Sequence, residues 1–596
     1  METVLGVERS LSGRRWRPRD GDSRTGLSLA QRFGFPEIVG RLLAGRGIGE
    51  DECERFLAPT IRDCLPDPSH LKDMDRAVER LVHAIRTGET IAVFGDYDVD
   101  GATSSALLKR FFESVGAHAI VYIPDRQREG YGPNTAALLK LQAQGASLVV
   151  TVDCGITSHV PLGAAAAAKL DVIVVDHHLG EPSIPPAVAV VNPNRIDESS
   201  PHGVLAAVGV TFLLVAGVNR ALREAGWYAT RPAPDLVQWL DLVALGTICD
   251  IVPLTGVNRA LVTQGLKVMR RRGNIGIAAL SDAAAVGEKL DAYHAGFILG
   301  PRVNAGGRVG ASDLGSRLLS TDDPDEARGL AEHLHVLNAE RRAIEAGVLA
   351  AAIEQVERSG IGPLIVASGQ GWHPGVIGIV ASRLKDRFNR PACVVALSDG
   401  VGRGSGRSVP GLALGPAVLA AQQAGLLING GGHAMAAGFT VEEAKLDAFR
   451  DFLMARAAEA LGNEEPVSEL RIDGSIACAA ATPDLTEVLD QLGPFGTGNS
   501  EPRFVIPNVR VIKADIVGGA HVRCIFGDGG GGARLKAIAF RVLEAPREGS
   551  TDVGIGPALL NAQGASFHLA GHLRADNWQG RNGVQLLIDD VAVARS

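Results

Sequence analysis

The stretch Thr90–Gly101, with the sequence TIAVFGDYDVDG, decides the fold. Its first five residues are rich in β-branched and aromatic side chains and Gly95 ends the run, which predicts a strand over Thr90–Phe94. The following Ala102–Val115 has its large apolar residues at helical spacing, which predicts a helix. A short strand, an acidic loop and a helix therefore begin the predicted fold.

The same alternation continues for three more strands. Apolar runs predict strands over Ala119–Ile123, Ser147–Val152 and Asp171–Val175, with helical patterns over 134–144 and 156–169 between them. Strands that are apolar throughout, with helices between them, indicate a parallel sheet covered on both faces. Two largely helical stretches, about 203–225 and 235–247, follow. The expected fold class is α/β.

The chain divides into five expected parts. Asp323–Ser359 has no Pro after Pro324 and only two Gly, which predicts one long helix, and the last segment alternates short strands with Gly-rich turns such as Gly527–Gly532. We expect an irregular arm or cap over 1–70, a first α/β domain over 71–322, the connecting helix over 323–360, a smaller α/β domain over 361–462, and a β barrel over 463–596.

The composition is that of a multidomain globular protein. Apolar residues make up 46% and charged residues 21% of the 596 residues, which excludes disorder, collagen and coiled coil as the main class. The net charge of −8 argues against binding a polyanion over the whole surface, but it leaves room for local basic patches.

Several features predict a cytoplasmic protein. Met1–Trp16 lacks the apolar core of a signal peptide, and the longest apolar stretch, Val204–Val218, is shorter than the roughly 20 residues of a membrane span. The seven Cys form no CxxC pair, which is typical of reduced thiols. No feature indicates an obligate oligomer, so we expect a monomer without a membrane segment.

Acidic and histidine residues follow three of the predicted strands. Asp96, Asp98 and Asp100 come after the first strand, Asp153 after the third, and Asp176-His177-His178 after the fourth. The carboxyl ends of parallel strands meet at one edge of a sheet, where ligands bind. We therefore expect these groups to lie together, with Asp250 closing over them from the end of the second helical stretch.

Carboxylates that converge in this way repel one another unless cations neutralise them. Mixed carboxylate and imidazole ligands suit Mn²⁺ or Mg²⁺, and less well Zn²⁺, Fe²⁺ or Co²⁺. Six or seven such ligands are enough for two ions about 4 Å apart, the arrangement that activates water and stabilises a phosphoryl transition state.

Each motif alone has a structural alternative. Asp-x-Asp-x-Asp-Gly also begins a calcium EF-hand loop, but position 12 would be Leu107, which cannot bind a metal, and a strand precedes the motif. Asp153 alone is as well explained by a helix cap, and His177-His178 by an ordinary histidine pair. Together on one sheet edge, the motifs favour a metal site.

At this point the sequence resembles a known family. The motifs GDYDVDG, VDCG, DHH and LGTICDIVPL resemble those of the DHH phosphoesterase superfamily, and their wider order, from about residue 70 onward, resembles the bacterial RecJ exonuclease family. The resemblance implies two divalent ions bound by Asp96, Asp98, Asp100, Asp153, His177 and Asp250, with the division between direct and supporting roles open for Asp96 and Asp100. It also implies that His178 orients the scissile phosphate, and that catalysis uses Asp98, Asp100, Asp153, His177, His178 and Asp250.

The smaller α/β domain has glycine-rich motifs of its own. They are Gly371–Gly375 (GWHPG), Ser405–Ser408 (SGRS) and Asn429–His433 (NGGGH). Consecutive Gly residues let backbone N–H groups bind an anion, although most such runs are simple turns, and none here fits a P-loop. The set resembles the DHH-associated (DHHA1) substrate-binding domain, which implies that Arg407, Ser408 and His433 hold a terminal phosphate. His373, Ser405, Gly431 and Gly432 complete the implied substrate-binding set.

A basic stretch joins the two domains. Residues 257–310 contain eight Lys or Arg and three acids, a local charge of +5. A solvated charged face explains this, but the family resemblance favours a phosphate track in which Arg302, Asn304 and Arg308 contact the entering strand without reading its sequence.

The terminal barrel is consistent with an OB-fold, which binds single strands through a basic groove and stacking aromatics. Its aromatic residues are few, several must lie in the core, and the sequence does not show which of them stack on bases. They are Phe504, Phe526, Phe540, Phe567 and Trp578.

The resemblance implies an exonuclease that degrades single-stranded DNA from the 5′ end to 5′-mononucleotides, in recombination and repair. A single-strand-binding protein and a RecQ-type helicase are the implied partners. Three rivals remain: a nano-RNase or cyclic-dinucleotide phosphodiesterase, which typically lacks the barrel, a shorter DHH-type pyrophosphatase, and a degenerate DHH scaffold that only binds DNA. Every expected ligand position is filled, which disfavours the scaffold.

Overall fold

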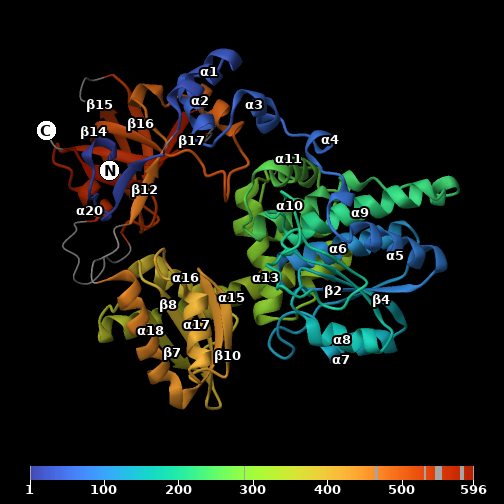
Figure 1. The fold of residues 1–596 in the computed structure, drawn as a ribbon. Coiled ribbons are helices and arrows are strands. Elements are labelled where there is room, and N and C mark those ends of the chain that lie inside the picture. The colour runs from blue at the N-terminus through green and yellow to red at the C-terminus, as the bar shows by residue number, and fades with distance from the viewer. Residues whose placement is uncertain are drawn as a thin grey trace. The chain divides into compact units, whose positions relative to one another are not determined.

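The computed structural model describes residues 2–19, 21–287, 289–462, 468–528, 532–543, 554–576 and 583–594. The chain forms two compact units (Figure 1). One contains residues 65–252 and 264–466, with both α/β domains. The other combines residues up to 64, residues 253–263 and the C-terminal part from 467 onward.

The first α/β domain has a five-stranded parallel sheet in the order β3-β2-β4-β5-β6. All its strand pairs are parallel, which confirms the predicted parallel sheet, and its strands are almost entirely buried except for the half-buried edge strand β3. The sequence predicted four of the strands, and the short β6 was missed. The strands are β2 (Thr90–Gly95), β3 (Ala119–Tyr122), β4 (Ala146–Val152), β5 (Asp171–Val175) and β6 (Ala189–Val191).

Helices cover both faces of this sheet (Figure 1). On one face α7 (Thr135–Ala143) and α8 (His159–Ala167) share an apolar core with β2, β4 and β5. On the other, α6 (Val99–Ser114) packs against α9 (Ala207–Glu224) and α10 (Leu240–Cys249), and α5 (Met74–Thr87) packs against α9. Of the described helices, none is both long and apolar enough to cross a membrane.

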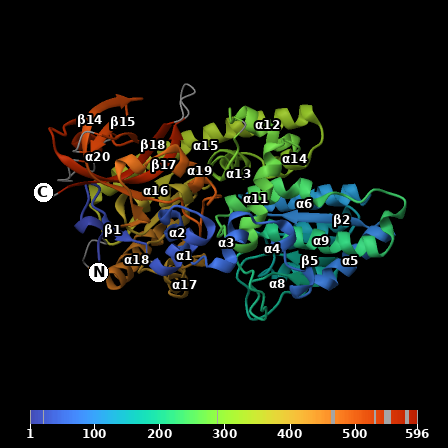
Figure 2. The ribbon, with the colours of Figure 1, turned by 90° about the horizontal axis from the view of Figure 1, so that it is seen from above.

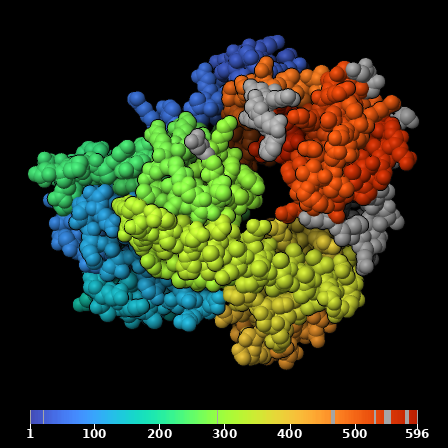
Figure 3. Space-filling model, turned by 180° about the vertical axis from the view of Figure 1, so that it is seen from behind, coloured from blue at the N-terminus to red at the C-terminus, as the bar shows by residue number. Residues whose placement is uncertain are grey.

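A group of helices leads from this sheet to the smaller domain. They are α11 (Gly256–Arg270), which is divided between the two units, α12 (Ile275–Ala283), the π-helical η5 (His294–Leu299), α13 (Gly300–Val309) and α14 (Leu314–Ser320). The predicted long helix is α15 (Pro324–Ser359), capped by Asp323. It packs on α12, α13 and α14 and reaches α16 (Ile377–Phe388) of the smaller domain (Figure 2). These helices form a continuous green-to-yellow surface in Figure 3.

The smaller domain has a five-stranded sheet in the order β10-β11-β9-β8-β7, in which only the β7–β8 pair is parallel. Helices α17 (Leu414–Gln423) and α18 (Leu446–Leu461) bury one face, and α16 (Ile377–Phe388) packs on β8 and β9. The strands are β7 (Ile365–Gln370), β8 (Ala392–Ser398), β9 (Val401–Arg407), β10 (Asn429–His433) and β11 (Ala436–Glu442).

The predicted barrel is present in the other unit. Strands β14 (Phe504–Val517), β15 (His521–Asp528), β16 (Arg534–Ala539), β18 (Gly583–Val593) and β17 (Ser566–Asp576) close because β17 also pairs with β14. Phe504, Phe526 and Phe567 are buried, whereas Phe540 is exposed. Trp578 and the centre of the glycine run lie outside the described residues. The remaining elements are β12 (Glu469–Ile472), β13 (Gly474–Ser475), α19 (Pro483–Asp490) and α20 (Ile555–Leu560).

The prediction of an irregular N-terminal segment is wrong. It contains β1 (Arg15–Pro18), α1 (Ser23–Phe33), α2 (Glu37–Ala44), α3 (Glu50–Leu57) and α4 (Ile61–Cys64). Leu29 and Leu42 are buried in the same apolar core as the barrel residue Phe504. The helices are short and bury their apolar faces only against this distant part of the chain, so local composition did not indicate them.

A buried polar contact fixes the N-terminal strand on the barrel. Strand β1 pairs in parallel with β12. The buried Trp16 donates a hydrogen bond from Nε1 to Oδ2 of the buried Asp590 (2.8 Å), and the Ser12 hydroxyl donates to Oδ1 (2.8 Å). The carboxylate therefore satisfies an indole N–H that has no access to water.

We predict that Asp590→Ala lowers the free energy of unfolding of this unit by about 1–3 kcal/mol, because it leaves the buried indole N–H without an acceptor. Asp590→Asn, which keeps an oxygen acceptor, should cost less. Urea denaturation followed by tryptophan fluorescence measures both. Equal stability of the alanine variant and the parent protein would contradict the assigned role.

Candidate metal centre and substrate-binding surface

The candidate site lies at the carboxyl ends of β2, β4 and β5. Strand β2 has β3 on one side and β4 on the other, so the direction of winding reverses between β2 and β4. In open parallel sheets such a switch point is where ligands bind. Asp96 and Asp98 follow β2 and Asp153 follows β4, as the sequence predicted. His177 follows β5 with one residue between them, also as predicted.

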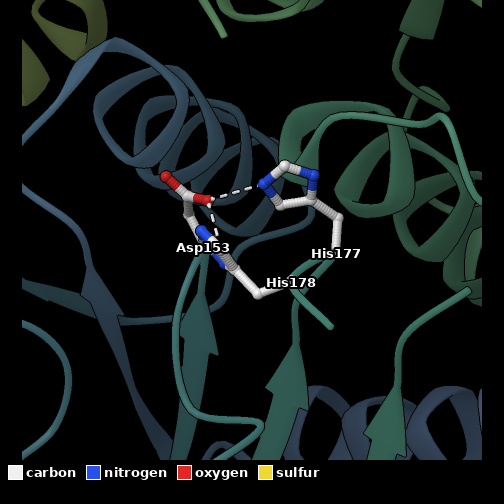
Figure 4. A group of neighbouring side chains, drawn as sticks. All are labelled: Asp153, His177 and His178. Carbon is white, nitrogen blue, oxygen red and sulfur yellow. Dashed lines mark ion pairs between the residues drawn. The ribbon is translucent and has the colours of Figure 1, made fainter. Parts of the chain in front are cut away.

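Asp153 faces two neighbouring histidines, whose ring centres lie 4.6 Å apart (Figure 4). Its Oδ1 is 3.3 Å from Nε2 of His177 and 4.0 Å from Nδ1 of His178. Asp153 has a φ of +61°, a left-handed conformation that a non-glycine residue rarely adopts. Its N–H donates to the Val175 carbonyl (3.0 Å) and its carbonyl accepts from the Tyr131 hydroxyl (3.0 Å). These two bonds hold the strained residue where its side chain meets both rings.

Three overlapping groups of donor atoms surround this point, and within each group the atoms lie within 4.8 Å of one another. They are Asp153 with His177 and His178, Asp100 with His177 and Asp250, and Asp96 with Asp98 and Asp153. His177 Nε2 is 3.6 Å from Asp250 Oδ2 and 4.0 Å from Asp100 Oδ2. The structure thus brings all six predicted metal-binding residues together, with Asp153 and His177 shared between groups.

Asp100 and Asp98 also hold neighbouring backbone. The Asp100 carboxylate is buried and accepts from the N–H groups of Ala207 (2.7 Å) and Val208 (2.8 Å) at the start of α9. Asp98 caps α6 by accepting from Gly101 (3.1 Å). Helix N-termini stabilise negative charge, so these bonds offset part of the repulsion within the cluster.

The remaining charge is uncompensated. Within the described part of the chain, the buried Oδ1 of Asp96 and Oδ2 of Asp250 have no hydrogen-bond partner. Burial, and then the neighbouring carboxylates, raise the pKa of Asp96, Asp100 and Asp153 well above its usual value, and raise the pKa of Asp250 to about 7. Buried oxygen donors that lack partners and repel one another fit divalent cations, so the site passes this test for Mn²⁺ or Mg²⁺.

The two histidines have different environments. His178 Nδ1 lies 2.7 Å from Asp176 Oδ1, and although burial acts in the opposite direction, this bond raises the pKa of His178 to about 9. Burial and then the charge of His178 lower the pKa of His177 to about 4. A neutral His177 suits metal ligation, and a cationic His178 suits contact with a phosphate oxygen.

Asp176 was quoted in the DHH motif, but its supporting role was not predicted. It is fully buried and accepts from the N–H groups of Ile156 (3.0 Å) and His177 (2.8 Å) as well as from the His178 ring. Asn192 and Asn194, which follow β6, donate to the carbonyls of His178 and His177. Recognising β6 would have placed both asparagines at the carboxyl edge.

Two of the predicted phosphate-binding residues of the smaller domain lie together at the start of α16. Ser405 and Arg407 lie against the first turn of α16, since a Cβ added at Gly378 would approach Ser405 Oγ (3.0 Å) and Arg407 Nη2 (3.3 Å). Arg407 Nη1 donates to Ser405 Oγ (3.2 Å) and to the Gly406 carbonyl (2.8 Å). A guanidinium, a hydroxyl and a helix N-terminus together form a surface suited to an anion.

Glycines leave the neighbouring sheet surface open. Gly438 pairs with both Ser405 and Gly431, and an added Cβ at Gly431 or Gly438 would have nothing within 4 Å. In the next row Ala436 pairs with both Arg407 and His433, so Arg407 and His433 lie in register two strands apart. Gly432 has a φ of +146°, and a Cβ there would collide with the backbone of β11.

The structure places the side chain of Ser408, a further predicted phosphate-binding residue, away from this surface. Its side chain is buried, and its hydroxyl lies 2.7 Å from the Leu412 carbonyl to which it donates. The hydroxyl is therefore used to fix the loop after β9.

Arginines from both domains gather beside the acidic cluster. Arg308 Nη1 donates to the Gly375 carbonyl (2.9 Å), and burial, then the charges of Arg126 and Arg341, lower the pKa of Arg308 to about 10, with Arg407 adding to this effect. The Arg126 guanidinium lies over the Tyr97 ring at 4.8 Å. Arg126 was not predicted, because its loop after β3 carries no motif. We call Arg126, Arg308 and Arg407 the arginine cluster.

His373 lies near the same loop, with Nε2 at 3.5 Å from Gln127 Nε2, and Nδ1 accepts from Gly375 N–H (3.0 Å). Arg302 and Asn304 lie on α13 with Arg308, but Arg302 contacts the Ile298 carbonyl (2.7 Å) and His335 of α15 (3.4 Å). The structure therefore places Arg308 with the arginine cluster and Arg302 nearer to α15.

With the geometry in place, comparison with known proteins identifies the family. Family models match the DHH family N-terminal domain over 90–247, the DHHA1 domain over 362–459 and the RecJ OB domain over 472–590. The single-stranded-DNA-specific exonuclease RecJ of Dickeya dadantii (strain 3937) is 39% identical over 573 residues, which cover 93% of this chain and 96% of that protein. The chain belongs to the RecJ family.

Solved RecJ structures agree in fold. RecJ from Thermus thermophilus in complex with Mn²⁺ has a TM-score of 0.80 at 30% identity, covering 97% of this chain and 79% of that one. The corresponding complex with Mg²⁺ has a TM-score of 0.74 at 29% identity, covering 98% and 79%. These comparisons confirm the predicted family and the predicted fold class. They also confirm that the family consists of metal-dependent nucleases and that Mn²⁺ or Mg²⁺ is the metal.

We predict that Asp250→Asn changes stability in opposite directions with and without metal. Without metal at pH 8 the variant should melt at a higher temperature than the parent protein, because it removes a buried charge from a repelling cluster. Saturating Mn²⁺, at about 100 times its dissociation constant, should stabilise the parent by about 2.7 kcal/mol for each ion bound and the variant less. Differential scanning calorimetry measures both effects.

The exposed Asp447→Asn is the matched control, since it removes the same charge away from the cluster. It should show the Mn²⁺ response of the parent protein. An Asp250→Asn variant that is destabilised without metal and fully stabilised by Mn²⁺ would contradict the assignment of Asp250 to the metal centre.

Proposed function

We propose that this protein is a single-stranded-DNA-specific exonuclease that releases 5′-mononucleotides in the 5′-to-3′ direction by two-metal-ion hydrolysis. The observation that carries the proposal is the juxtaposition of two opposite charge clusters. Buried carboxylates with unpaired oxygens lie at the carboxyl edge of the sheet, and α13, which carries Arg308, packs against their loop, since a Cβ added at Gly307 would lie 2.6 Å from the Tyr97 carbonyl. Arg126 lies over the ring of the same Tyr97. A phosphodiester beside bound cations fits both clusters.

The chemistry divides between the ions and the protein. When bound, the two ions supply an activated water and neutralise the developing charge of the scissile phosphate. Asp96, Asp98, Asp100, Asp153, His177 and Asp250 are the proposed ligands. His178, held by Asp176, is proposed to donate a hydrogen bond to a phosphate oxygen and so to orient the phosphorus for attack.

The arginine cluster and the smaller domain are proposed to hold the nucleotide at the 5′ end. Arg407, Ser405 and the first turn of α16 would bind its terminal phosphate, and the open surface over Gly431 and Gly432, with His433 at its edge, would accommodate the nucleotide. His373 lies beside the same surface. Arg302, Asn304 and Arg308 would contact the following phosphates. The 5′ direction rests on family membership alone.

The barrel unit favours long single strands over the small substrates of the rival phosphodiesterases. The chain matches the RecJ OB domain over 472–590, and OB-folds bind single strands without strong sequence preference. From the family we further propose a role in recombination and repair, a cytoplasmic location and a monomer. A single-strand-binding protein and a RecQ-type helicase are the proposed partners.

We predict that an oligonucleotide labelled at its 5′ end and incubated with Mn²⁺ releases a labelled mononucleotide at the earliest times. A 3′-labelled strand should shorten without early release of a labelled mononucleotide, and blunt duplex should resist. Asp153→Ala should lower the rate at least about a thousandfold, because it removes a group shared between donor groups. Gel electrophoresis and thin-layer chromatography separate the products.

Early release from the 3′ label would contradict the proposed direction. Hydrolysis of dinucleotides without cleavage of long DNA would favour the small-substrate phosphodiesterase, and binding of DNA without hydrolysis of either would favour the scaffold.

We also predict that Arg407→Ala abolishes any preference for a 5′-phosphate over a 5′-hydroxyl end, because it removes the charged fork at the start of α16. The ratio of kcat/KM for the two ends should fall about tenfold or more from its value in the parent protein, corresponding to one lost charge-assisted hydrogen bond. Arg450→Ala removes an arginine of the same domain that pairs with Asp447 on α18, across the sheet from α16, and as the control it should keep the ratio. An unchanged ratio in Arg407→Ala would place the terminal phosphate elsewhere.

A further inference from the structure

Two aromatic side chains outside the site are exposed and stacked on each other. Tyr293 is 54% and Phe297 is 70% exposed, and their ring centres lie 5.3 Å apart at an interplanar angle of 29°. Among the described residues, the other aromatics that are mainly exposed are Tyr131, which is bonded to the site, and Phe540 on the barrel. Large apolar rings held together in water indicate a binding surface.

The stacked pair is anchored on the helix that carries Asp250. Tyr293 immediately precedes η5 and Phe297 lies within it. A Cβ at Gly296 would be 3.1 Å from the Ile248 side chain, and Cys249 Sγ lies 3.6 Å from the Ala295 carbonyl. Ile248 and Cys249 form the last turn of α10, which Asp250 ends. The segment that carries the pair therefore packs on the helix that ends at Asp250 of the candidate metal centre.

Positive charge borders the pair on both sides in sequence. Arg270 donates from Nε to the Leu290 carbonyl (2.6 Å), three residues before Tyr293, and Arg302 donates from Nη1 to the Ile298 carbonyl (2.7 Å), the residue after Phe297. The acid nearest to the rings in sequence, Asp291, is paired with His294 (2.7 Å). A nucleic acid strand carries a phosphate beside every base, so guanidinium groups on both sides of an aromatic pair fit its alternation of bases and phosphates.

We infer that Tyr293 and Phe297 form a platform on which bases of the single strand stack while Arg270 and Arg302 contact its phosphates. This inference rests on the proposed function and adds to it a base-contacting site beyond the scissile nucleotide. Stacking on π faces is tolerant of sequence, since every base has one. The platform explains how Arg302 serves the strand although it lies apart from the arginine cluster.

Binding is tested by fluorescence anisotropy in the full chain with Asp153→Ala, so that the strand is not degraded. Two probes of equal length are used, oligo(dT) and an oligonucleotide whose sugars carry no bases. Tyr293→Ala/Phe297→Ala should weaken binding of oligo(dT) about tenfold and leave the abasic probe unchanged. Tyr293→Phe/Phe297→Tyr should bind like the parent, because both rings remain.

Val160→Ala, which truncates an apolar residue that is 80% exposed on α8, is the matched control and should change neither affinity. An equal loss for both probes, or no loss for oligo(dT), would overturn the platform while leaving the nuclease proposal intact. Failure of the parent protein to bind either probe would overturn both proposals.

Discussion

The main physical constraint on this structure is the mutual repulsion of carboxylates that are buried at one edge of a parallel sheet. The fold forces this arrangement, because β2 and β4 end side by side and their acidic loops share one small volume. Two devices offset part of the charge: the N-terminus of α9 binds Asp100, and Asp98 caps α6. Neither reaches the unpaired oxygens of Asp96 and Asp250. Divalent cations would neutralise this remaining charge, and the folded chain already holds the carboxylates close enough together to bind them.

The second organising feature is the opposite charge supplied by the smaller domain and the linking helices. Arg308 on α13 and Arg407 on β9 come from distant parts of the chain, and Arg126 joins them from the loop after β3. Glycines at 431 and 438 keep the adjacent sheet surface free of side chains. In the proposed function, a phosphate would contact bound cations on the acidic side and guanidinium groups on the other. The proposed site would therefore need both domains.

Much of this arrangement could be predicted from sequence, because apolar runs locate strands and loop acids after them must meet at the carboxyl edge. The six proposed metal ligands followed from that rule together with the family resemblance. The same rule failed where local pattern carries no signal. Arg126 lies in a loop without a motif, and the buried Ser408 hydroxyl is bonded to the carbonyl of Leu412 in its own loop. The N-terminal helices bury themselves only against the barrel core. Tyr293 and Phe297 were missed because exposure is not visible in a sequence.

The central claim is that two divalent ions occupy the acidic cluster, and anomalous diffraction from crystals soaked in Mn²⁺ tests it most directly. We expect two manganese peaks per chain about 4 Å apart. One should lie among Asp96, Asp98 and Asp153, and the other among Asp100, His177 and Asp250, with Asp153 near both. A single peak, or peaks that avoid Asp153, would contradict the account.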